Sequence, residues 1–328
     1  MAHLLIFTIL PLCSALGIAF WVVERLGPAT ATRVALVMQR PLWVGLGGLL
    51  SLLYVLCVGF SAYLPVVIDA VESTVASTAG LWQRGNPLYT TIHAGSRYSL
   101  LYGPLCYVPY TLSLSWFGGG VLTLKLVMVG LNVALLVVLW LVFRAMLGGV
   151  EALVPMGFIL AGLMMKGMST FMIRGDVTLA LAIALAFLAV HQKQKWFAAT
   201  LFVLAGTVAL DIKFTGVLYL LVPFHALWQR YRRWLALVAA GAVPVVGLAP
   251  FALSSVSLRN YLGWISQASK HPLALKLFAM NVVAGAILVV PVVLMLVQYL
   301  RVEPELARDF LRTQRLLFVC WRVSPGAS

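Results

Sequence analysis

The sequence predicts an all-α protein, a polytopic bundle of about nine transmembrane helices. Composition is the first reason: 62% of the 328 residues are hydrophobic and 10% are charged, whereas roughly a quarter of the residues in a soluble domain are charged. The second reason is that the apolar residues form long unbroken runs, which exclude the short alternating segments of a membrane β-barrel. At about 20 residues per crossing, these runs suffice for roughly eight to ten spans.

The first apolar run, 4–23, lacks the basic start and the cleavage site of a signal peptide, so it is predicted to be a retained span. The linker 24–40 contains three arginines, which place it in the cytoplasm. The second span, 42–68, therefore emerges on the outside, where the polar stretch 69–100 forms a loop. Seven further spans are predicted at 121–143, 152–165, 177–191, 196–210, 214–228, 235–253 and 278–300.

Short basic loops fix the orientation of these spans. Lys and Arg cluster at 192–195 and 229–233, as the positive-inside rule predicts for cytoplasmic loops. The net charge of +14 is therefore attributed to topology, and no nucleic-acid partner is expected. The four cysteines lie far apart inside apolar runs, which indicates neither a disulfide framework nor a zinc site.

The apolar segment 101–117 is predicted not to cross the membrane. Counting from the basic loops puts both of its ends outside, and its Tyr, Trp and Pro residues are typical of a helix that lies in the interface. Residues 1–300 are thus expected to form one transmembrane domain whose extracytoplasmic loop, 69–100, is the first candidate for a catalytic loop. The remaining 301–328 are read either as a short cytoplasmic tail or as the cut end of a longer chain.

Four acidic residues are predicted at the outer ends of spans: Asp69, Glu72, Asp176 and Asp211. Each has an ordinary structural explanation, since Asp69 could cap a helix, Glu72 could be solvated and Asp211 could pair with Lys213. Their clustering on one side instead favours a functional site. Asp69 and Glu72 have the i, i+3 spacing that places two carboxylates on one helix face. Such a pair suits either a general base or a ligand of Mg²⁺ or Mn²⁺, with Asp176 as a third metal ligand.

Basic residues accompany these acids on the same side. They suit the binding of a phosphate or pyrophosphate group, Arg through its bidentate fork and Lys as a point charge. The alternative is that their side chains reach toward lipid headgroups, and this explanation is favoured for Lys270 and Lys276. The full set is Arg84, Arg97, Lys166, Arg174, Lys213, Arg259, Lys270 and Lys276. The polar break at 209–216, inside a long apolar region, also suggests a pocket because such breaks are tolerated only next to protein or water.

Several motifs, taken in order, resemble the GT-C superfamily of integral-membrane glycosyltransferases. After the acid at the start of the loop come Gly85-Asn86-Pro87-Leu88-Tyr89 and then Tyr98-Ser99-Leu100-Leu101-Tyr102-Gly103-Pro104-Leu105. Ile173-Arg174-Gly175-Asp176 is similar to an Arg-Pro-Asp element with Gly in place of Pro, and Asp211-Ile212-Lys213-Phe214-Thr215-Gly216 is similar to a Lys-x-(Ser/Thr)-Gly break. The resemblance covers 66–233.

The resemblance implies a GT-C-like fold and an inverting transfer of a sugar from a polyprenyl-phosphate donor to a glycan, lipid or protein acceptor. Asp69 would be the catalytic base, and Glu72 and Asp176 would position the acceptor or a divalent metal. Substrate binding is assigned to Arg174 and Lys213, which would hold the lipid phosphate with help from Arg97 or a metal. Tyr102, with Tyr89 and Tyr98, would stack on sugar or lipid. The expected location is a bacterial inner (plasma) membrane, as a multi-pass protein in contact with membrane lipids.

Two other functions stay open at this stage. A transporter or flippase of lipid-linked or small polar substrates would show repeated halves and charges near the bilayer midplane, whereas the acids here lie at span ends and no inverted repeat is visible. A non-catalytic scaffold or inactive relative is the third hypothesis, because the chain is shorter than most GT-C enzymes.

Overall fold

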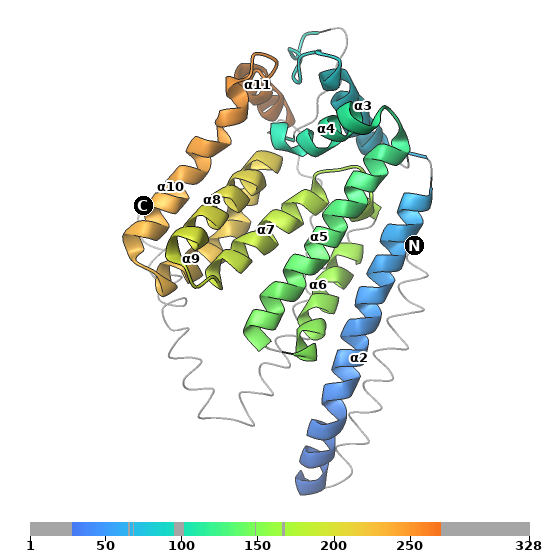
Figure 1. Ribbon diagram of the computed structural model, residues 1–328, viewed down its shortest axis with the longest axis vertical. Helices are drawn as coiled ribbons and strands as arrows, with labels where there is room; N and C mark the ends of the chain where they lie inside the picture. Colours follow the sequence, from blue (N-terminus) through green and yellow to red (C-terminus); the bar gives the residue numbers. More distant parts are fainter. Residues whose placement is uncertain are drawn as a thin grey trace. The chain divides into compact units, whose positions relative to one another are not determined.

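The computed structural model describes residues 28–64, 66–67, 69–94, 102–147, 149–165 and 168–269, all of which belong to one compact unit that ends at Lys270. This part of the chain contains helices and no strand (Figure 1). The α-helices are α2 (Pro28–Tyr63), α3 (Ala70–Gln83), α4 (Val108–Phe117), α5 (Val121–Leu147), α6 (Leu153–Met165), α7 (Asp176–Val190), α8 (Lys195–Ile212), α9 (Leu221–Arg230), α10 (Arg233–Gly247) and α11 (Leu258–Ser269). The 3₁₀ helices are η1 (Pro104–Cys106), η2 (Val150–Ala152), η3 (Met168–Phe171), η4 (Phe214–Leu220) and η5 (Ala249–Ala252).

Four helical segments are long and apolar enough to cross a membrane: Pro41–Tyr63, Val121–Leu147, Lys195–Ile212 and Arg233–Ala252. Two further apolar helices, Val150–Met164 and Asp176–Val190, are shorter. The predicted span 214–228 divides into η4 and α9, and neither is long enough alone. The predicted spans 4–23 and 278–300 and the tail 301–328 lie outside the described residues, so the total of nine spans stays a prediction.

The predicted linker 24–40 is helical from Pro28 onward, and its cytoplasmic location stays a prediction. Helix α2 begins at Pro28 and continues through Pro41 into the apolar segment without a break. Ala, Leu, Met, Gln and Arg, which have high helix propensity, make up most of 28–40.

The segment 101–117 contains only short helices. Helix α4 has 10 residues, which at 1.5 Å per residue extend about 15 Å, half of the roughly 30 Å hydrocarbon core. Helix α4 therefore cannot cross the membrane alone, in agreement with the expected non-spanning segment. Its placement in the interface stays a prediction.

Helix α7 lies at the centre of the packing. It contacts α8 on one side and α5 on the other, while α8 contacts α10 and α2 contacts α6 (Figure 1). The α7 side chains divide between two cores: Ala182 and Ala186 pack in a core with α8 and α10, whereas Val177 and Ala184 pack in a core with α2, α5 and α6. The small residues of α7 allow both neighbours to approach closely.

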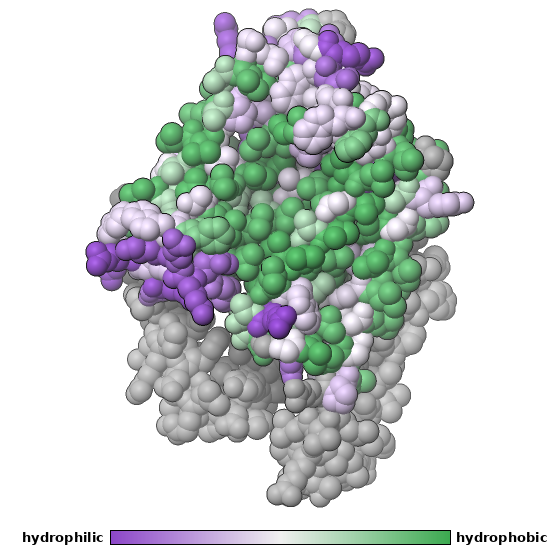
Figure 2. All heavy atoms as spheres, viewed as in Figure 1, coloured by the Kyte–Doolittle hydropathy of each residue, from purple (hydrophilic) through white to green (hydrophobic). Residues whose placement is uncertain are grey.

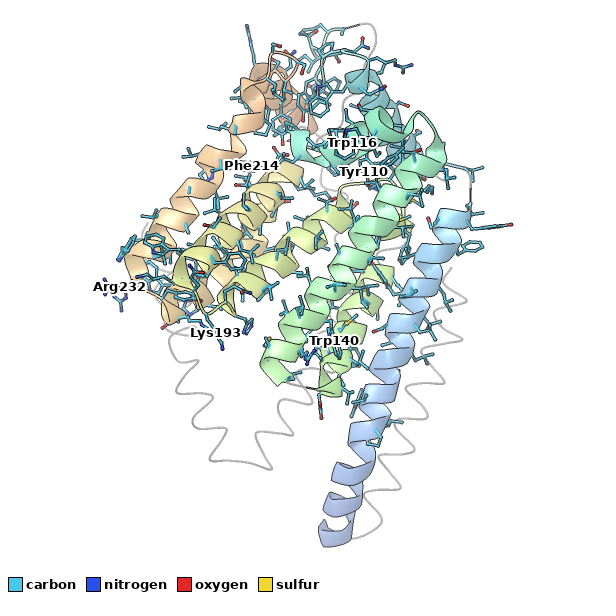
Figure 3. The ribbon with its side chains drawn as sticks, in the orientation of Figure 1. Tyr110, Trp116, Trp140, Lys193, Phe214 and Arg232 are labelled. Carbon is cyan, nitrogen blue, oxygen red and sulfur yellow. The ribbon has the colours of Figure 1, made fainter. Side chains whose placement is uncertain are left out.

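Apolar side chains cover much of the exposed surface. The face drawn in Figure 2 shows a hydrophobic band between two groups of hydrophilic residues. Large apolar side chains such as Leu56, Leu126 and Val238 are more than half exposed. Exposed apolar surface of this extent is typical of contact with lipid. In Figure 3, Lys193 and Arg232 lie at one end, and Tyr110 and Trp116 lie toward the other.

Hydrogen bonds link the segments that the orientation argument placed on the outer side. Leu88 N donates to Ser255 O over 2.8 Å, and the indole of Trp264 donates to Thr90 O over 2.8 Å. At the opposite end, the Tyr231 hydroxyl donates to Gln192 O and so connects the two basic loops. The segments assigned to a common side therefore meet in the fold, while the compartment that each side faces stays a prediction.

Candidate functional site

Four charged residues form a chain of alternating sign at the N-terminal ends of α3 and α7 and the C-terminal end of α8. Arg174 Nη1 lies 3.1 Å from Asp69 Oδ2 and Arg174 Nε lies 3.3 Å from Asp176 Oδ2. Asp176 Oδ1 accepts a 2.6 Å hydrogen bond from Lys213 Nζ. The two ends of this chain are the more accessible, since the side chains of Asp69 and Lys213 are 33% and 36% exposed. We call Asp69, Arg174, Asp176 and Lys213 the charged cluster.

The position of Asp69 follows from helix capping. Asp69 is the N-cap of α3, and its Oδ1 accepts a 2.7 Å hydrogen bond from Glu72 N. Asp is among the best N-cap residues because its carboxylate satisfies an amide that has no partner inside the helix. The cap bond engages one oxygen and leaves Oδ2 to face Arg174. Helix capping therefore uses Oδ1 of Asp69, whereas the contact with Arg174 in the candidate site uses Oδ2.

Arg174 and Asp176 flank a glycine at the start of α7. A Cβ on Gly175 would lie 2.9 Å from Ile212 Cγ2 and 3.0 Å from Cys106 Sγ, so a larger residue would push α7 away from its neighbours. Asp176 occupies the first turn of α7, where the helix dipole favours a negative charge. In Arg174-Gly175-Asp176, the glycine therefore lets the start of α7 pack closely against Ile212 and Cys106, and the residues on either side of it form an ion pair.

Lys213 also contacts the ring of Tyr102. Its Nζ lies 5.6 Å from the ring centroid, within the range of a cation–π interaction. Burial lowers the pKa of Lys213, but its hydrogen bond and charge attraction to Asp176 outweigh this effect and leave the pKa raised. Burial, aided by the charge of Asp176, raises the pKa of the Tyr102 hydroxyl. At neutral pH the site therefore holds a charged ammonium over a neutral phenol.

Asp211 does not pair with Lys213 as one structural explanation expected. It is buried, and its Oδ2 accepts a 2.5 Å hydrogen bond from Leu105 N. Its backbone oxygen accepts a 2.8 Å hydrogen bond from Gly103 N, and a Cβ on Gly103 would lie 2.0 Å from that oxygen. Asp211 thus binds the turn at 103–105 and brings the motif around Tyr102 against the motif around Lys213.

Glu72 is fully buried, and its carboxylate contacts groups outside the charged cluster. Its Oε1 lies 2.9 Å from Lys125 Nζ on α5 and accepts a 3.0 Å hydrogen bond from Ile173 N. Glu72 is therefore neither solvated nor open to an acceptor, and its partner Lys125 was not among the predicted site residues. One signal was available: Lys125 is the only charged residue in 121–143, and a charge within an apolar helix requires a partner.

The remaining predicted binding residues are Arg97, Tyr98 and Tyr89. Arg97 and Tyr98 lie outside the described residues. Tyr89 is fully buried and its hydroxyl donates to Tyr102 O over 2.7 Å, so this ring is not available to stack on a ligand.

The three carboxylates considered as metal ligands each face a cation instead, Glu72 toward Lys125, Asp69 toward Arg174 and Asp176 toward Lys213. No group of three His, Cys, Asp or Glu residues gathers within the described ranges. This arrangement gives no support to a metal site, and no step below uses a metal.

Comparison with known proteins found no protein-family model, no curated protein and no solved structure that matches the chain. The resemblance to GT-C enzymes therefore depends on the motifs alone. The geometry adds that three of these motifs, around Tyr102, Arg174 and Lys213, meet at one place although they lie far apart in the sequence.

Proposed function

We propose that this protein is a membrane glycosyltransferase that moves a sugar from a polyprenyl-phosphate donor to an acceptor hydroxyl on the extracytoplasmic face. The observation that carries the proposal is the charged cluster itself. It places a partly exposed carboxylate, Asp69, beside two cations, Arg174 and Lys213, at the ends of apolar helices. A sugar transfer from a lipid phosphate requires these two kinds of group, a base for the acceptor and cations for the leaving group.

Asp69 is the preferred base. In a single displacement, the acceptor oxygen forms a bond to the anomeric carbon while the bond from that carbon to the phosphate oxygen breaks, and the configuration inverts. The acceptor proton passes to the base, and the electron pair of the broken bond leaves with polyprenyl phosphate. The Asp69 side chain is 33% exposed, whereas that of Glu72 is 0% exposed, so Asp69 is the carboxylate that an acceptor can reach.

Arg174 and Lys213 are assigned to the donor phosphate. Both side chains lie against Asp176, which holds the two cations near each other before a phosphate arrives. The attraction to Asp176 also raises the pKa of Lys213, so the ammonium stays charged at neutral pH. Charge-assisted contacts of this kind are about twice as strong as neutral hydrogen bonds.

The apolar surface next to Lys213 suits the lipid part of the donor. Phe214 and Leu218 on η4 are 69% and 61% exposed, and Phe214 directly follows the lysine that would hold the phosphate (Figure 3). A polyprenyl chain could lie on these side chains while its phosphate contacts Lys213. Exposed apolar side chains that directly follow a phosphate-binding lysine in the chain favour a lipid-phosphate donor over a water-soluble nucleotide sugar.

The test is a transfer assay with the purified protein in lipid vesicles. A panel of polyprenyl-phosphate hexoses and pentoses is supplied with mixed acceptors, and the release of polyprenyl phosphate is measured. We expect release with at least one donor, and we expect the exposed control variant Arg144→Gln to behave like the wild type. If no donor is consumed but a lipid-linked sugar moves between the leaflets, the protein is a flippase and the proposal is wrong.

A further inference from the structure

Lys125 forms a buried ion pair at the place where three segments meet. The lysine belongs to α5, its partner Glu72 belongs to α3, and the same carboxylate oxygen accepts the Ile173 N–H from the segment that precedes α7. The Lys125 and Glu72 side chains are both 0% exposed. One carboxylate thus connects α3, α5 and the residues just before Arg174.

The stability of the fold does not explain why Lys125 and Glu72 form a buried ion pair. Burial removes both charges from water, and a pair of apolar side chains of similar size is often as stable as a buried ion pair, or more stable. Stability alone therefore gives no reason for a lysine here.

The geometry gives another reason, which is the orientation of Arg174. Residues 172–175 lie between η3 and α7 and have no regular helical structure. Glu72 holds the amide of Ile173, directly before Arg174, and the Glu72 amide itself donates to Asp69. Glu72 is therefore connected to both partners of the Asp69–Arg174 ion pair. Its amide binds Asp69 directly, and its carboxylate binds the residue that precedes Arg174.

We propose that Lys125 is a positioning residue: by fixing Glu72, it anchors the Ile173 amide and so directs Arg174 toward Asp69. The structural part of this inference stands by itself, and its catalytic consequence rests on the proposed glycosyltransferase function. Lys125 does not contact the substrate in this account. It acts through Glu72 on the cation that would hold the donor phosphate.

Hydrogen–deuterium exchange of the amides at 171–175 tests the anchor without any enzyme assay. The variants are Lys125→Met, Lys125→Arg and the double variant Lys125→Met/Glu72→Met, which removes both charges and keeps the helices packed. Arg144→Gln, at the exposed end of the same helix, is the matched control. Peptides from α8 report any general loss of stability.

In Lys125→Met and in the double variant we expect the amides at 171–175 to exchange about tenfold faster, because a charge-assisted hydrogen bond is lost or weakened, while α8 is unchanged. Lys125→Arg should restore most of the protection. Unchanged exchange at 171–175 in folded Lys125→Met would overturn the proposal, even if the double variant, which lacks the Glu72 acceptor itself, exchanges faster. An equal increase in α8 would also overturn it, since the pair would then contribute only general stability.

The transfer assay separates this inference from the proposed function. If Asp69→Asn stays fully active while Lys125→Met shows the local increase in exchange, the anchor stands and the transferase mechanism is wrong. If Asp69→Asn is inactive but exchange at 171–175 does not change, the mechanism stands and Lys125 is not a positioning residue.

Discussion

Arg174 Nη1 lies 3.1 Å from Asp69 Oδ2, although the two residues are 105 positions apart in the chain. The contact joins the N-cap of α3 to the segment before α7. Asp69 therefore serves as a helix cap through one oxygen and as an ion-pair partner through the other. A useful substitution at Asp69 removes the charge and keeps the helix cap. Asn meets this requirement because it caps a helix as well as Asp does but carries no charge.

Gly103→Ala should destabilise the fold, because its Cβ would lie 2.0 Å from the backbone oxygen of Asp211. Overpacking typically costs about 1–3 kcal/mol. Thermal unfolding in detergent measures this loss. Gly119→Ala is the matched control, since nothing lies within 4 Å of an added Cβ there. Equal melting temperatures for the two variants would mean that the turn at 103–105 does not contact the end of α8.

Arg174→Gln and Lys213→Met should each weaken the binding of polyprenyl phosphate. A hydrogen bond to a charged group contributes about 1.5–3 kcal/mol, so a loss of at least tenfold in affinity is expected for each variant. Titration of the lipid phosphate against intrinsic fluorescence gives the two dissociation constants. The exposed Arg84 on the same side supplies the control Arg84→Gln, and an equal loss in all three variants would indicate non-specific attraction.

Cysteine labelling tests the sidedness. Thr91 and Gln194 are both exposed and lie in segments assigned to opposite sides. A membrane-impermeant maleimide added to intact cells should label Thr91→Cys at once, and should label Gln194→Cys only after the membrane is permeabilised. The unsubstituted chain, with its four native cysteines, gives the background. Labelling of position 194 but not of position 91 would reverse the orientation.

The sequence predicted the features of the site that depend on sidedness. Positive-inside counting placed Asp69, Arg174, Asp176 and Lys213 on one side, and the structure brings these four side chains together. The polar break at 209–216 falls between two helices, since α8 ends at Ile212 and η4 begins at Phe214. The pocket that this break suggested stays a prediction.

The sequence could not predict contacts that depend on the register between distant helices. The partner of Glu72 is a lysine 53 positions away on α5, and nothing in the sequence pattern sets the rotation of α5 against α3. The partner of Asp211 is a backbone amide, that of Leu105, and a backbone donor has no signature in composition or charge.

The most direct test of the central claim is the single-turnover rate of sugar transfer by Asp69→Asn. The amide keeps the cap of α3 and the shape of the side chain but cannot take a proton from the acceptor, so folding and donor binding should stay close to those of the wild type. A general base contributes about 10²–10⁴-fold to rate, and we predict a fall of that size at saturating donor. A rate for Asp69→Asn equal to that of the wild type, in the same preparation and with the same donor, would contradict the assignment of Asp69 as the base.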